Sequence, residues 1–497
     1  MITLDEKIGQ LFVAPAAPLQ GGTHFADWDA LIKECHVANV LLKASDAKTQ
    51  IAFLQRLQSL SKFHLLVVAD AEWGLGMRMV DAISFPRNLT LGAVQDLSLI
   101  EMMGRCIGKQ AKQAGIHLNL APVVDVNINS MNPIIHMRSL GQDPHEVARR
   151  CCAIIRGMQK EGLLTCAKHF PGHGDTVTDS HLDLPMLSLS IVRLNQVELI
   201  PFQAAIDAGV DGVMSAHILV DCLDTYPASM SPACMQKLLR ESMGFQGLAI
   251  TDALNMHALT NTWSVEEIAI RAFEAGHDFL LYGAHLMEDV DDLMQSQIPR
   301  AFRALREAFL SGRLSIADLD ARVNRILAIK ERCLPIPAAP PATLMDPEAL
   351  LLKRELFRQA LTIVGQPATI NESFVYMAIG GSSEDWIVKK YREEGIEVQC
   401  LDLQDYQIPS CEKKIVAGLH RVKGLGGDFG LSNEMTELLQ NSDRVILFCT
   451  PYVMQVIHGE SIVVAYENDP DAQEAAYDAI QGKWLPLGRL PIQVMLK

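Results

Sequence analysis

Eight short apolar segments recur in the first two thirds of the chain, and they constrain the fold more than any other feature. Each has the length of a buried strand, and helix-length amphipathic stretches separate them. They lie at residues 11–14, 40–42, 65–69, 117–120, 163–167, 212–216, 248–251 and 279–282. Strands and helices that alternate in this way predict an α/β fold, namely a (β/α)8 TIM-like barrel. A doubly wound open sheet is the alternative, and the long interval between the third and fourth segments indicates one irregular barrel unit.

The amino-acid composition and the pattern of apolar runs change after residue 332. Four prolines fall within residues 334–342, a composition typical of a stiff linker. Beyond them, β-forming runs at 375–379, 398–401, 445–448 and 462–466 alternate with helical stretches such as 384–394. The sequence therefore predicts a catalytic barrel domain in residues 1–332, a Pro-rich linker in 333–345 and a smaller α/β sandwich domain in 346–497.

The composition is that of a soluble globular protein, with 49% hydrophobic and 21% charged residues among 497. A formal net charge of −16 disfavours nucleic acid and anionic lipid as partners. No apolar run approaches the ~18 residues of a membrane span, and residues 1–8 lack the pattern of an export signal. The 11 cysteines are scattered, as is typical of reduced thiols. We therefore expect a cytoplasmic protein, a monomer or homodimer, with no membrane or nucleic-acid partner.

The densest proton-transfer chemistry of the chain follows the fifth apolar segment. It is the sequence Lys168-His169-Phe170-Pro171-Gly172-His173-Gly174-Asp175, followed by Asp179-Ser180-His181. A buried strand that ends in a polar, glycine-containing loop is where α/β enzymes place their active sites. Each part also has a structural interpretation, since His169 alone fits a core histidine and Asp179-Ser180 fits the cap of a turn. The cluster as a whole favours a functional site.

Other predicted strands also end in polar residues. Asp70 follows the third strand, Asp125 comes after the fourth, His217 ends the sixth and Asp252 ends the seventh. The carboxyl ends of barrel strands converge on one face, so these side chains are predicted to share a site with Lys168 and His169. For Asp125 or His217 alone, a hydrogen bond to a neighbouring loop explains the residue equally well.

These residues resemble the glycoside hydrolases of family 3. The motif that begins at Lys168 and ends at His181 is similar to the signature of bacterial β-N-acetylglucosaminidases of peptidoglycan recycling. The segment 250–256, which contains Asp252, resembles the family's nucleophile motif, and segments 70–78 and 132–139 resemble its two sugar-binding segments. The resemblance implies a retaining exo-β-N-acetylglucosaminidase, a hydrolase whose substrate is a small carbohydrate. That substrate would be a muropeptide fragment with terminal β-linked N-acetylglucosamine.

The residue types suit retaining cleavage of a glycoside. Asp252 fits the nucleophile, which must be an ionised carboxylate beneath the anomeric carbon. His181 fits the acid and base, because imidazole titrates near neutrality, and Asp179 fits a partner that fixes its tautomer. The candidate substrate-binding residues, which would contact sugar hydroxyls or the acetamido group, are Asp70, Arg78, Arg138, Lys168 and His169. No cofactor and no metal ion is expected.

Three alternatives remain open. The first keeps the family but changes the reaction, to a β-glucosidase or a phosphorolytic enzyme. The second is a metal-dependent hydrolase whose ligands come from the cluster of histidines and aspartates between residues 169 and 183. The third is a carbohydrate-binding protein that has lost catalysis, and the presence of both Asp252 and His181 argues against it.

Overall fold

The computed structural model describes residues 2–18, 25–180, 182–283, 290–367, 369–370, 372–404, 413–424 and 428–493. The chain divides into two compact units. The first unit contains Met1–Phe85, Glu101–Val126 and Val147–Asp346. The second contains Pro86–Ile100, Asn127–Glu146 and Pro347–Lys497, so two of its three segments precede the C-terminal region.

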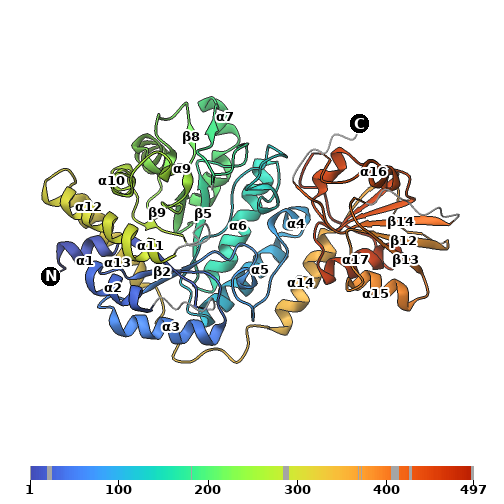
Figure 1. Ribbon diagram of the computed structural model, residues 1–497, viewed down its shortest axis with the longest axis horizontal. Helices are drawn as coiled ribbons and strands as arrows, with labels where there is room; N and C mark the ends of the chain where they lie inside the picture. Colours follow the sequence, from blue (N-terminus) through green and yellow to red (C-terminus); the bar gives the residue numbers. More distant parts are fainter. Residues whose placement is uncertain are drawn as a thin grey trace. The chain divides into compact units, whose positions relative to one another are not determined.

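The first unit is built around an eight-stranded parallel sheet, part of which is labelled in Figure 1. Its order is β10-β1-β2-β3-β4-β5-β7-β9, and a parallel bridge between Ile250 and Phe279 brings the two edge strands together. The sheet is therefore a nearly closed barrel, which confirms the predicted (β/α)8 fold and makes the open-sheet alternative wrong. The strands are β1 (Phe12–Ala16), β2 (Asn39–Leu42), β3 (Leu66–Ala69), β4 (Leu118–Asn119), β5 (Leu164–Phe170), β7 (Gly212–Ser215), β9 (Leu248–Thr251) and β10 (Leu280–Leu281).

The barrel strands are buried along most of their length because both of their faces are covered. Every residue of β1, β2, β3, β5, β7 and β9 is buried, as expected for a parallel sheet enclosed by helices. A small separate ladder pairs β6 (Met186–Leu187) with β8 (Leu219–Val220).

The helices that follow the barrel strands have distinct start and stop signals. Helix α3 begins after Asp46, whose side chain accepts a hydrogen bond from the Thr49 N–H at 2.9 Å. Helix α10 begins after Ser264 and ends at Gly276, which has φ 119°. The α-helices that lie wholly in this unit are α1 (Leu4–Gly9), α2 (Phe25–Cys35), α3 (Ala47–Leu60), α7 (Ile191–Gln196), α8 (Leu199–Asp207), α9 (His257–Thr260), α10 (Val265–Ala275), α11 (Val290–Asp292), α12 (Ile298–Leu310) and α13 (Ile316–Glu331).

The long interval between β3 and β4 is irregular, as the sequence indicated. It holds α4 (Asn88–Ala93) and α5 (Leu97–Gln113), and α6 (Pro144–Lys160) follows β4. Helix α4 and the starts of α5 and α6 are assigned to the second unit. The described part of the chain also contains two π-helices, η4 (Ala233–Ser242) and η5 (Leu293–Gln297). Its 3-10 helices are η1 (Leu75–Met77), η2 (His136–Arg138), η3 (Ala228–Met230) and η6 (Pro451–Gln455).

The second unit contains a six-stranded sheet of order β11-β16-β15-β14-β12-β13. All neighbours are parallel except β11, which runs antiparallel to β16. The strands are β11 (Thr362–Gly365), β12 (Phe374–Ile379), β13 (Glu397–Leu401), β14 (Lys414–Leu419), β15 (Arg444–Leu447) and β16 (Ser461–Val464). With helices α14 (Pro347–Ala360), α15 (Trp386–Glu393), α16 (Asn433–Gln440) and α17 (Pro470–Ile480), this sheet confirms the predicted α/β sandwich.

Aromatic side chains organise the core of the second unit. The ring of Tyr391 lies 4.9 Å from that of Tyr376 and 5.5 Å from that of Tyr477. The carboxyl ends of the parallel strands β12 to β16 lie on one side of this sheet, and the segment after β16 leads into α17.

The proline-rich segment between α13 and α14 packs against the first unit. Leu344 is buried, and its carbonyl oxygen accepts a hydrogen bond from the Gln110 side chain at 2.8 Å. The carbonyl oxygen of Pro337 accepts another from Gln55 at 2.7 Å. None of the helices in the described part of the chain combines the length and apolarity that a membrane span requires.

Candidate active site

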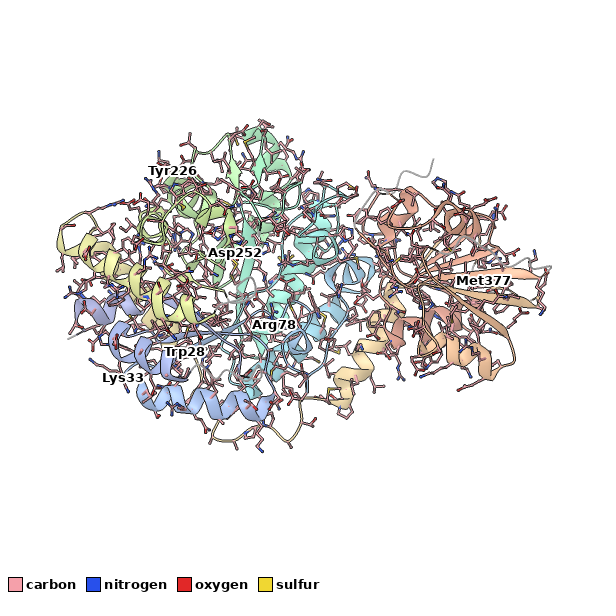
Figure 2. All side chains as sticks on the ribbon, viewed as in Figure 1. Trp28, Lys33, Arg78, Tyr226, Asp252 and Met377 are labelled. Atoms are coloured by element: carbon pink, nitrogen blue, oxygen red, sulfur yellow. The ribbon has the colours of Figure 1, made fainter. Side chains whose placement is uncertain are left out.

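Three of the predicted site residues lie at the carboxyl ends of barrel strands. Asp70 directly follows β3, Lys168 lies near the end of β5, and Asp252 directly follows β9. Because all these strands are parallel, their carboxyl ends lie at one edge of the barrel. Figure 2 labels Asp252 together with Arg78, which belongs to the same unit.

Lys168 is the centre of a buried charge network. Its Nζ atom lies 2.9 Å from Asp70 Oδ1 and 2.8 Å from Glu72 Oε1. The side chains of Lys168 and Glu72 are only 3% and 1% exposed. A buried ammonium group is stable in such a place because two carboxylates compensate its charge.

Two further cations surround Asp70. Arg78 Nη2 lies 3.2 Å from Asp70 Oδ2, and Lys43 Nζ lies 3.5 Å from the same oxygen. Burial by itself would raise the pKa of Asp70, but the charges of Lys168, Lys43 and Arg78 hold this pKa well below its usual value. The Asp70 carboxyl group is therefore ionised, and its position is fixed by three donors.

His169 is held by a carboxylate from the neighbouring strand end. Asp125 Oδ2 lies 2.8 Å from His169 Nδ1 and also accepts the His169 backbone N–H at 3.1 Å. Its other oxygen accepts the backbone N–H of His173 at 2.7 Å. Burial acts to raise the pKa of Asp125, and the opposing effect of His169 and His173 lowers it overall. Asp125 thus positions the residues that follow β5.

The His173 imidazole contacts two hydroxyl groups of the polar loop, one through each ring nitrogen. Its Nδ1 atom lies 2.8 Å from Thr176 Oγ1, and its Nε2 atom lies 3.2 Å from Ser180 Oγ. Burial lowers the pKa of His173 to about 4, so the imidazole is neutral at physiological pH. A neutral ring has one donor and one acceptor nitrogen, and hydroxyl groups can satisfy both.

The loop is also anchored near its start. Gly172 has φ 132°, and a Cβ atom there would lie 2.8 Å from Glu198 Cβ, so a larger residue does not fit. Arg193 Nη2 lies 3.3 Å from Asp175 Oδ2 and 2.9 Å from Glu198 Oε1. These contacts connect the loop to helices α7 and α8.

Asp179, one residue of the predicted acid and base pair, lies at the far end of this loop. The backbone carbonyl of Asp179 accepts hydrogen bonds from the N–H groups of Leu182 and Asp183 at 2.9 and 3.1 Å. Asp179 therefore begins a turn. His181 lies outside the described residues, so its pairing with Asp179 stays a prediction.

Asp252 is positioned by one hydrogen bond to the neighbouring strand β7 and one from the residue that follows it. Its N–H donates to the Ser215 carbonyl at 3.0 Å, and its Oδ1 accepts the Ala253 N–H at 2.7 Å. His217 Nε2 lies 2.9 Å from the Ala253 carbonyl oxygen, and His217 Nδ1 lies 2.7 Å from Ser229 Oγ. The charge of Asp252 also acts on the pKa of His173, so the two residues belong to one electrostatic environment.

Arg138 belongs to the second unit, unlike the other predicted binding residues. It ends the η2 turn, and its Nη1 donates to the Ile134 carbonyl at 3.3 Å. Its backbone carbonyl accepts a hydrogen bond from the Asn88 side chain at 2.6 Å.

The structure thus brings Asp70, Arg78 and Lys168 into direct contact and adds two residues that sequence reasoning gave no role. These are Glu72, which lies within the segment 70–78, and Lys43. Lys43 directly follows β2, so the rule that located Asp70 would also have found it.

Within the described ranges, which omit His181, no group of three or more His, Cys, Asp or Glu side chains is arranged to hold a metal ion. The imidazoles of His169 and His173 instead lie against Asp125, Thr176 and Ser180.

Comparisons with known proteins agree with the sequence motifs. The glycosyl hydrolase family 3 N terminal domain matches residues 3–329. A "Beta-hexosaminidase A" of Pseudoalteromonas piscicida is 31% identical over 379 residues, covering 70% of this chain and 63% of that protein. A "Beta-N-acetylglucosaminidase/beta-glucosidase" of Cellulomonas fimi is 30% identical over 380 residues, covering 72% of this chain and 64% of that protein. The aligned regions therefore span less than two thirds of either relative.

A solved structure extends the likeness to both units. It is a glycoside hydrolase family 3 β-N-acetylglucosaminidase from Paenibacillus sp. str. FPU-7, with 27% sequence identity and a TM-score of 0.85. The match covers 100% of this chain and 100% of that chain. Together with the family match, it confirms the resemblance that the motifs predicted.

Proposed function

We propose that this chain, which belongs to glycosyl hydrolase family 3, is a retaining exo-β-N-acetylglucosaminidase. The observation that carries the proposal is the joint placement of a carboxylate, Asp252, and the Lys168–Asp70–Arg78 network at the carboxyl edge of one barrel. The names of the relatives from Pseudoalteromonas piscicida and Cellulomonas fimi support the same activity.

The charge network is suited to binding one sugar ring. The Asp70 carboxylate accepts hydrogen bonds from sugar hydroxyls, and the Lys168 and Arg78 groups donate them. Because these groups are fixed and largely buried, a sugar that lacks a matching hydroxyl leaves them unpaired. Such sites discriminate strongly against the wrong substrate. His169, fixed by Asp125, adds a ring nitrogen to the same edge.

Asp252 would form the covalent bond to the sugar. Its carboxylate oxygen attacks the anomeric carbon as the glycosidic bond breaks, and water later releases the sugar with net retention. The Ala253 N–H at 2.7 Å from Oδ1 stabilises the charged form and orients the other oxygen.

His181 would protonate the leaving oxygen and then take a proton from water, with Asp179 fixing its ring. The anchored loop supports this role, because Ser180, the residue between them, is held by His173 at 3.2 Å. His181→Ala should therefore harm substrates with poor leaving groups by at least ~100-fold more than activated aryl glycosides. Equal losses on the two substrate types would assign His181 to binding instead.

We propose hydrolysis rather than phosphorolysis as the main reaction. A phosphate acceptor needs uncompensated positive charge, and the cations nearest to Asp70 face the carboxylates of Asp70 and Glu72. Product analysis in phosphate buffer by phosphorus NMR tests this, and N-acetylglucosamine 1-phosphate as the main product would contradict it.

A muropeptide fragment in the cytoplasm is the natural substrate that we propose. The motif resemblance supports the substrate. The location is supported by the ten described cysteines, which are all free thiols.

The direct test compares p-nitrophenyl β-N-acetylglucosaminide with the corresponding β-glucoside. The proposal predicts a kcat/KM at least about tenfold higher for the N-acetyl sugar. Faster cleavage of the glucoside would make the chain a β-glucosidase of the same family, and activity abolished by a chelator would favour the metal-dependent alternative.

A further inference from the structure

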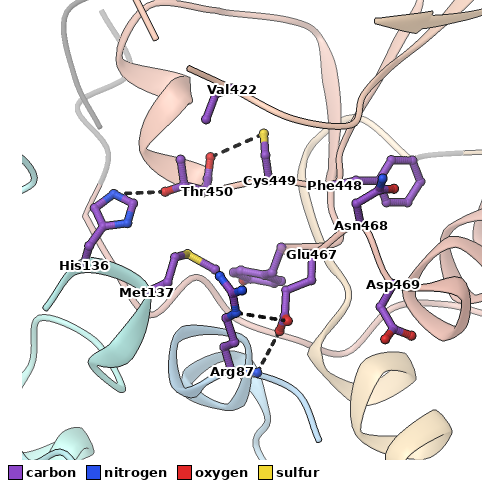
Figure 3. A pocket seen from close by; sticks show the side chains of 11 residues that line it. Arg87, His136, Met137, Val422, Phe448, Cys449, Thr450, Glu467, Asn468 and Asp469 are labelled. Atoms are coloured by element: carbon purple, nitrogen blue, oxygen red, sulfur yellow. Dashed lines mark hydrogen bonds and ion pairs between the residues drawn. The ribbon is translucent and has the colours of Figure 1, made fainter. Parts of the chain in front are cut away.

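The second unit contains a cavity that the proposed hydrolysis does not use. Its volume is about 410 Å³, within the range of small-molecule sites. It opens beyond the carboxyl ends of β15 and β16, which is where open α/β sheets bind ligands. Its lining residues are Arg87, His136, Met137, Val422, Phe448, Cys449, Thr450, Tyr466, Glu467, Asn468 and Asp469 (Figure 3).

The backbone around this cavity is strained at two places. Among the described residues, the non-glycine residues with positive φ are His36, His136, Phe429 and Tyr466. Two of them, His136 with φ 34° and Tyr466 with φ 66°, line the cavity. Such conformations are costly for residues with a side chain and concentrate at ligand sites. At Tyr466 the turn is tight, because the Glu467 N–H donates to the Ala465 carbonyl at 2.8 Å.

The polar wall of the cavity is formed by Glu467 and Arg87, a stretched ion pair whose charged atoms are too far apart for a hydrogen bond. Glu467 Oε1 accepts hydrogen bonds from the Arg87 backbone N–H at 2.8 Å and from Thr90 Oγ1 at 2.6 Å. Glu467 Oε2 lies 3.8 Å from Arg87 Nε, which is too far for a hydrogen bond. A hydroxyl group can bridge such a gap, because it donates to the carboxylate and accepts from the guanidinium.

The amide at the floor of the cavity is held in one orientation. Asn468 Oδ1 lies 3.0 Å from His420 Nδ1 and accepts a hydrogen bond from Gln473 Nε2 at 2.7 Å. Asn468 Nδ2 donates to Asp385 Oδ1 at 3.3 Å. A side chain fixed by three neighbours is a preorganised wall for a ligand.

The charges around the cavity balance. Arg87 faces Glu467, and Asp469 Oδ2 lies 2.8 Å from Lys353 Nζ. Burial lowers the pKa of His136 to about 4, so its ring is neutral at physiological pH. The remaining wall includes Met137 and Val422, which are partly exposed and offer apolar surface. This combination fits a ligand with no net charge, several hydroxyl groups and an apolar face.

We propose that the cavity of the second unit binds a neutral sugar. One hydroxyl bridges Glu467 and Arg87, and the C–H face of the ring packs on Met137 and Val422. The site is independent of the proposed cleavage, since none of its lining residues is among the proposed catalytic or substrate-binding residues.

Hydrogen–deuterium exchange of the full-length chain tests this proposal with three probes, glucose, N-acetylglucosamine and glucuronate. The neutral sugars should slow exchange in peptides that cover residues 448–469, which contain no proposed substrate-binding residue of the barrel, and the anionic glucuronate should do so at least about tenfold less tightly. Turnover of the p-nitrophenyl glycoside reports the barrel site separately, so a failure of one proposal leaves the other intact.

A matched pair of tryptophan variants and one charge variant test the cavity directly. Val422→Trp places an indole ring in the cavity and should abolish the protection, whereas Leu485→Trp adds the same ring at a position that is 71% exposed and should not. Glu467→Gln keeps the side-chain shape and should weaken sugar binding about tenfold. Melting temperatures confirm that each variant is folded.

Three results would overturn the proposal. The first is that neither neutral sugar slows exchange at these peptides. The second is equal protection in wild type, Val422→Trp and Glu467→Gln. The third is tighter binding of glucuronate than of the neutral sugars.

Discussion

The carboxyl edges of the barrel and of the second sheet differ in the number and burial of their charged side chains. At the carboxyl edge of the barrel, Lys168, Lys43 and Arg78 crowd around Asp70 and Glu72, and most of these side chains are buried. At the carboxyl edge of the second sheet, one stretched pair, Arg87 and Glu467, faces a cavity with much apolar surface. The same topological position therefore supports two kinds of site.

The difference follows from what each edge must stabilise. Glycoside cleavage develops positive charge on the sugar and negative charge on the leaving oxygen, so fixed charges in a dry site are useful. Binding a neutral molecule requires matched hydrogen bonds and apolar contact, and a dense array of buried charges would cost desolvation energy there.

Asp252→Asn should give the largest effect. The amide keeps the shape of the side chain but cannot act as a nucleophile, so kcat should fall by at least ~10⁴-fold. Steady-state kinetics on p-nitrophenyl N-acetylglucosaminide measures the loss, with circular dichroism as the control for folding. A loss below about tenfold would show that another carboxylate performs this step.

Lys168→Met should destabilise the barrel strongly. It leaves the buried carboxylates of Asp70 and Glu72 beside each other without the ammonium group between them, which typically costs 3–5 kcal/mol, so we expect about 4 kcal/mol. Urea unfolding measures the change in the free energy of unfolding.

Lys160→Met is the matched control. Lys160 pairs with Glu101 on the surface, its side chain is 55% exposed, and the loss should stay below about 1 kcal/mol. Similar losses in the two variants would show that the barrel network contributes no more than a surface pair.

Acid should destabilise the first unit before the second. Burial lowers the pKa of His117 and His173 to about 4 and that of His277 to about 3, whereas in the second unit the same effect is found at His136. A lowered folded-state pKa means that the unfolded chain binds more protons as the pH falls from about 6.5 to 4, so stability is lost in that window. Each histidine contributes up to about 1.4 kcal/mol per pH unit.

Hydrogen–deuterium exchange between pH 7 and pH 4.5 resolves the two units, after correction for the intrinsic exchange rate. The control is His277→Asn, which removes one buried imidazole of the first unit and should flatten its pH dependence. If the second unit opened first, the balance of buried histidines would not explain the acid sensitivity.

Glu467→Gln should have the smallest effect on stability. The Arg87 side chain is 51% exposed and its Nε lies 3.8 Å from the carboxylate, so the loss of charge should change the free energy of unfolding by about 1 kcal/mol or less. Thermal unfolding measures it. A loss comparable to that of Lys168→Met would remove the contrast between the two edges.

The barrel could be predicted from sequence because its strands are buried on both faces and read as separate apolar runs. The run at residues 163–167, for example, became β5 (Leu164–Phe170). In the second unit the runs for β12, β13, β15 and β16 were found, but β11 and β14 were not. Strand β11 is half-exposed and lies at the sheet edge, so its apolar pattern is weak. Strand β14 carries the apolar run 415–419 after the exposed Lys414, and the prediction missed it.

The site could be predicted in part. Strand-end placement identified Asp70, Lys168 and Asp252, because local sequence fixes which residue follows a strand. The same rule applies to Lys43, which directly follows β2. Glu72 acquires its meaning only from its contact with Lys168 at 2.8 Å, and no local pattern encodes that distance. The cavity near Glu467 also escaped prediction, since its walls come from residues as far apart in sequence as Arg87 and Asp469.

The central claim is that Asp252 at the end of β9 forms a glycosyl bond during turnover. The most direct measurement is to incubate the enzyme with a fluorinated slow N-acetylglucosaminide and to locate the covalent adduct by peptide mass spectrometry. We predict one added sugar on the peptide that contains Asp252, and none in Asp252→Asn. An adduct on any other carboxylate, or a labelled Asp252→Asn protein, would contradict the assignment.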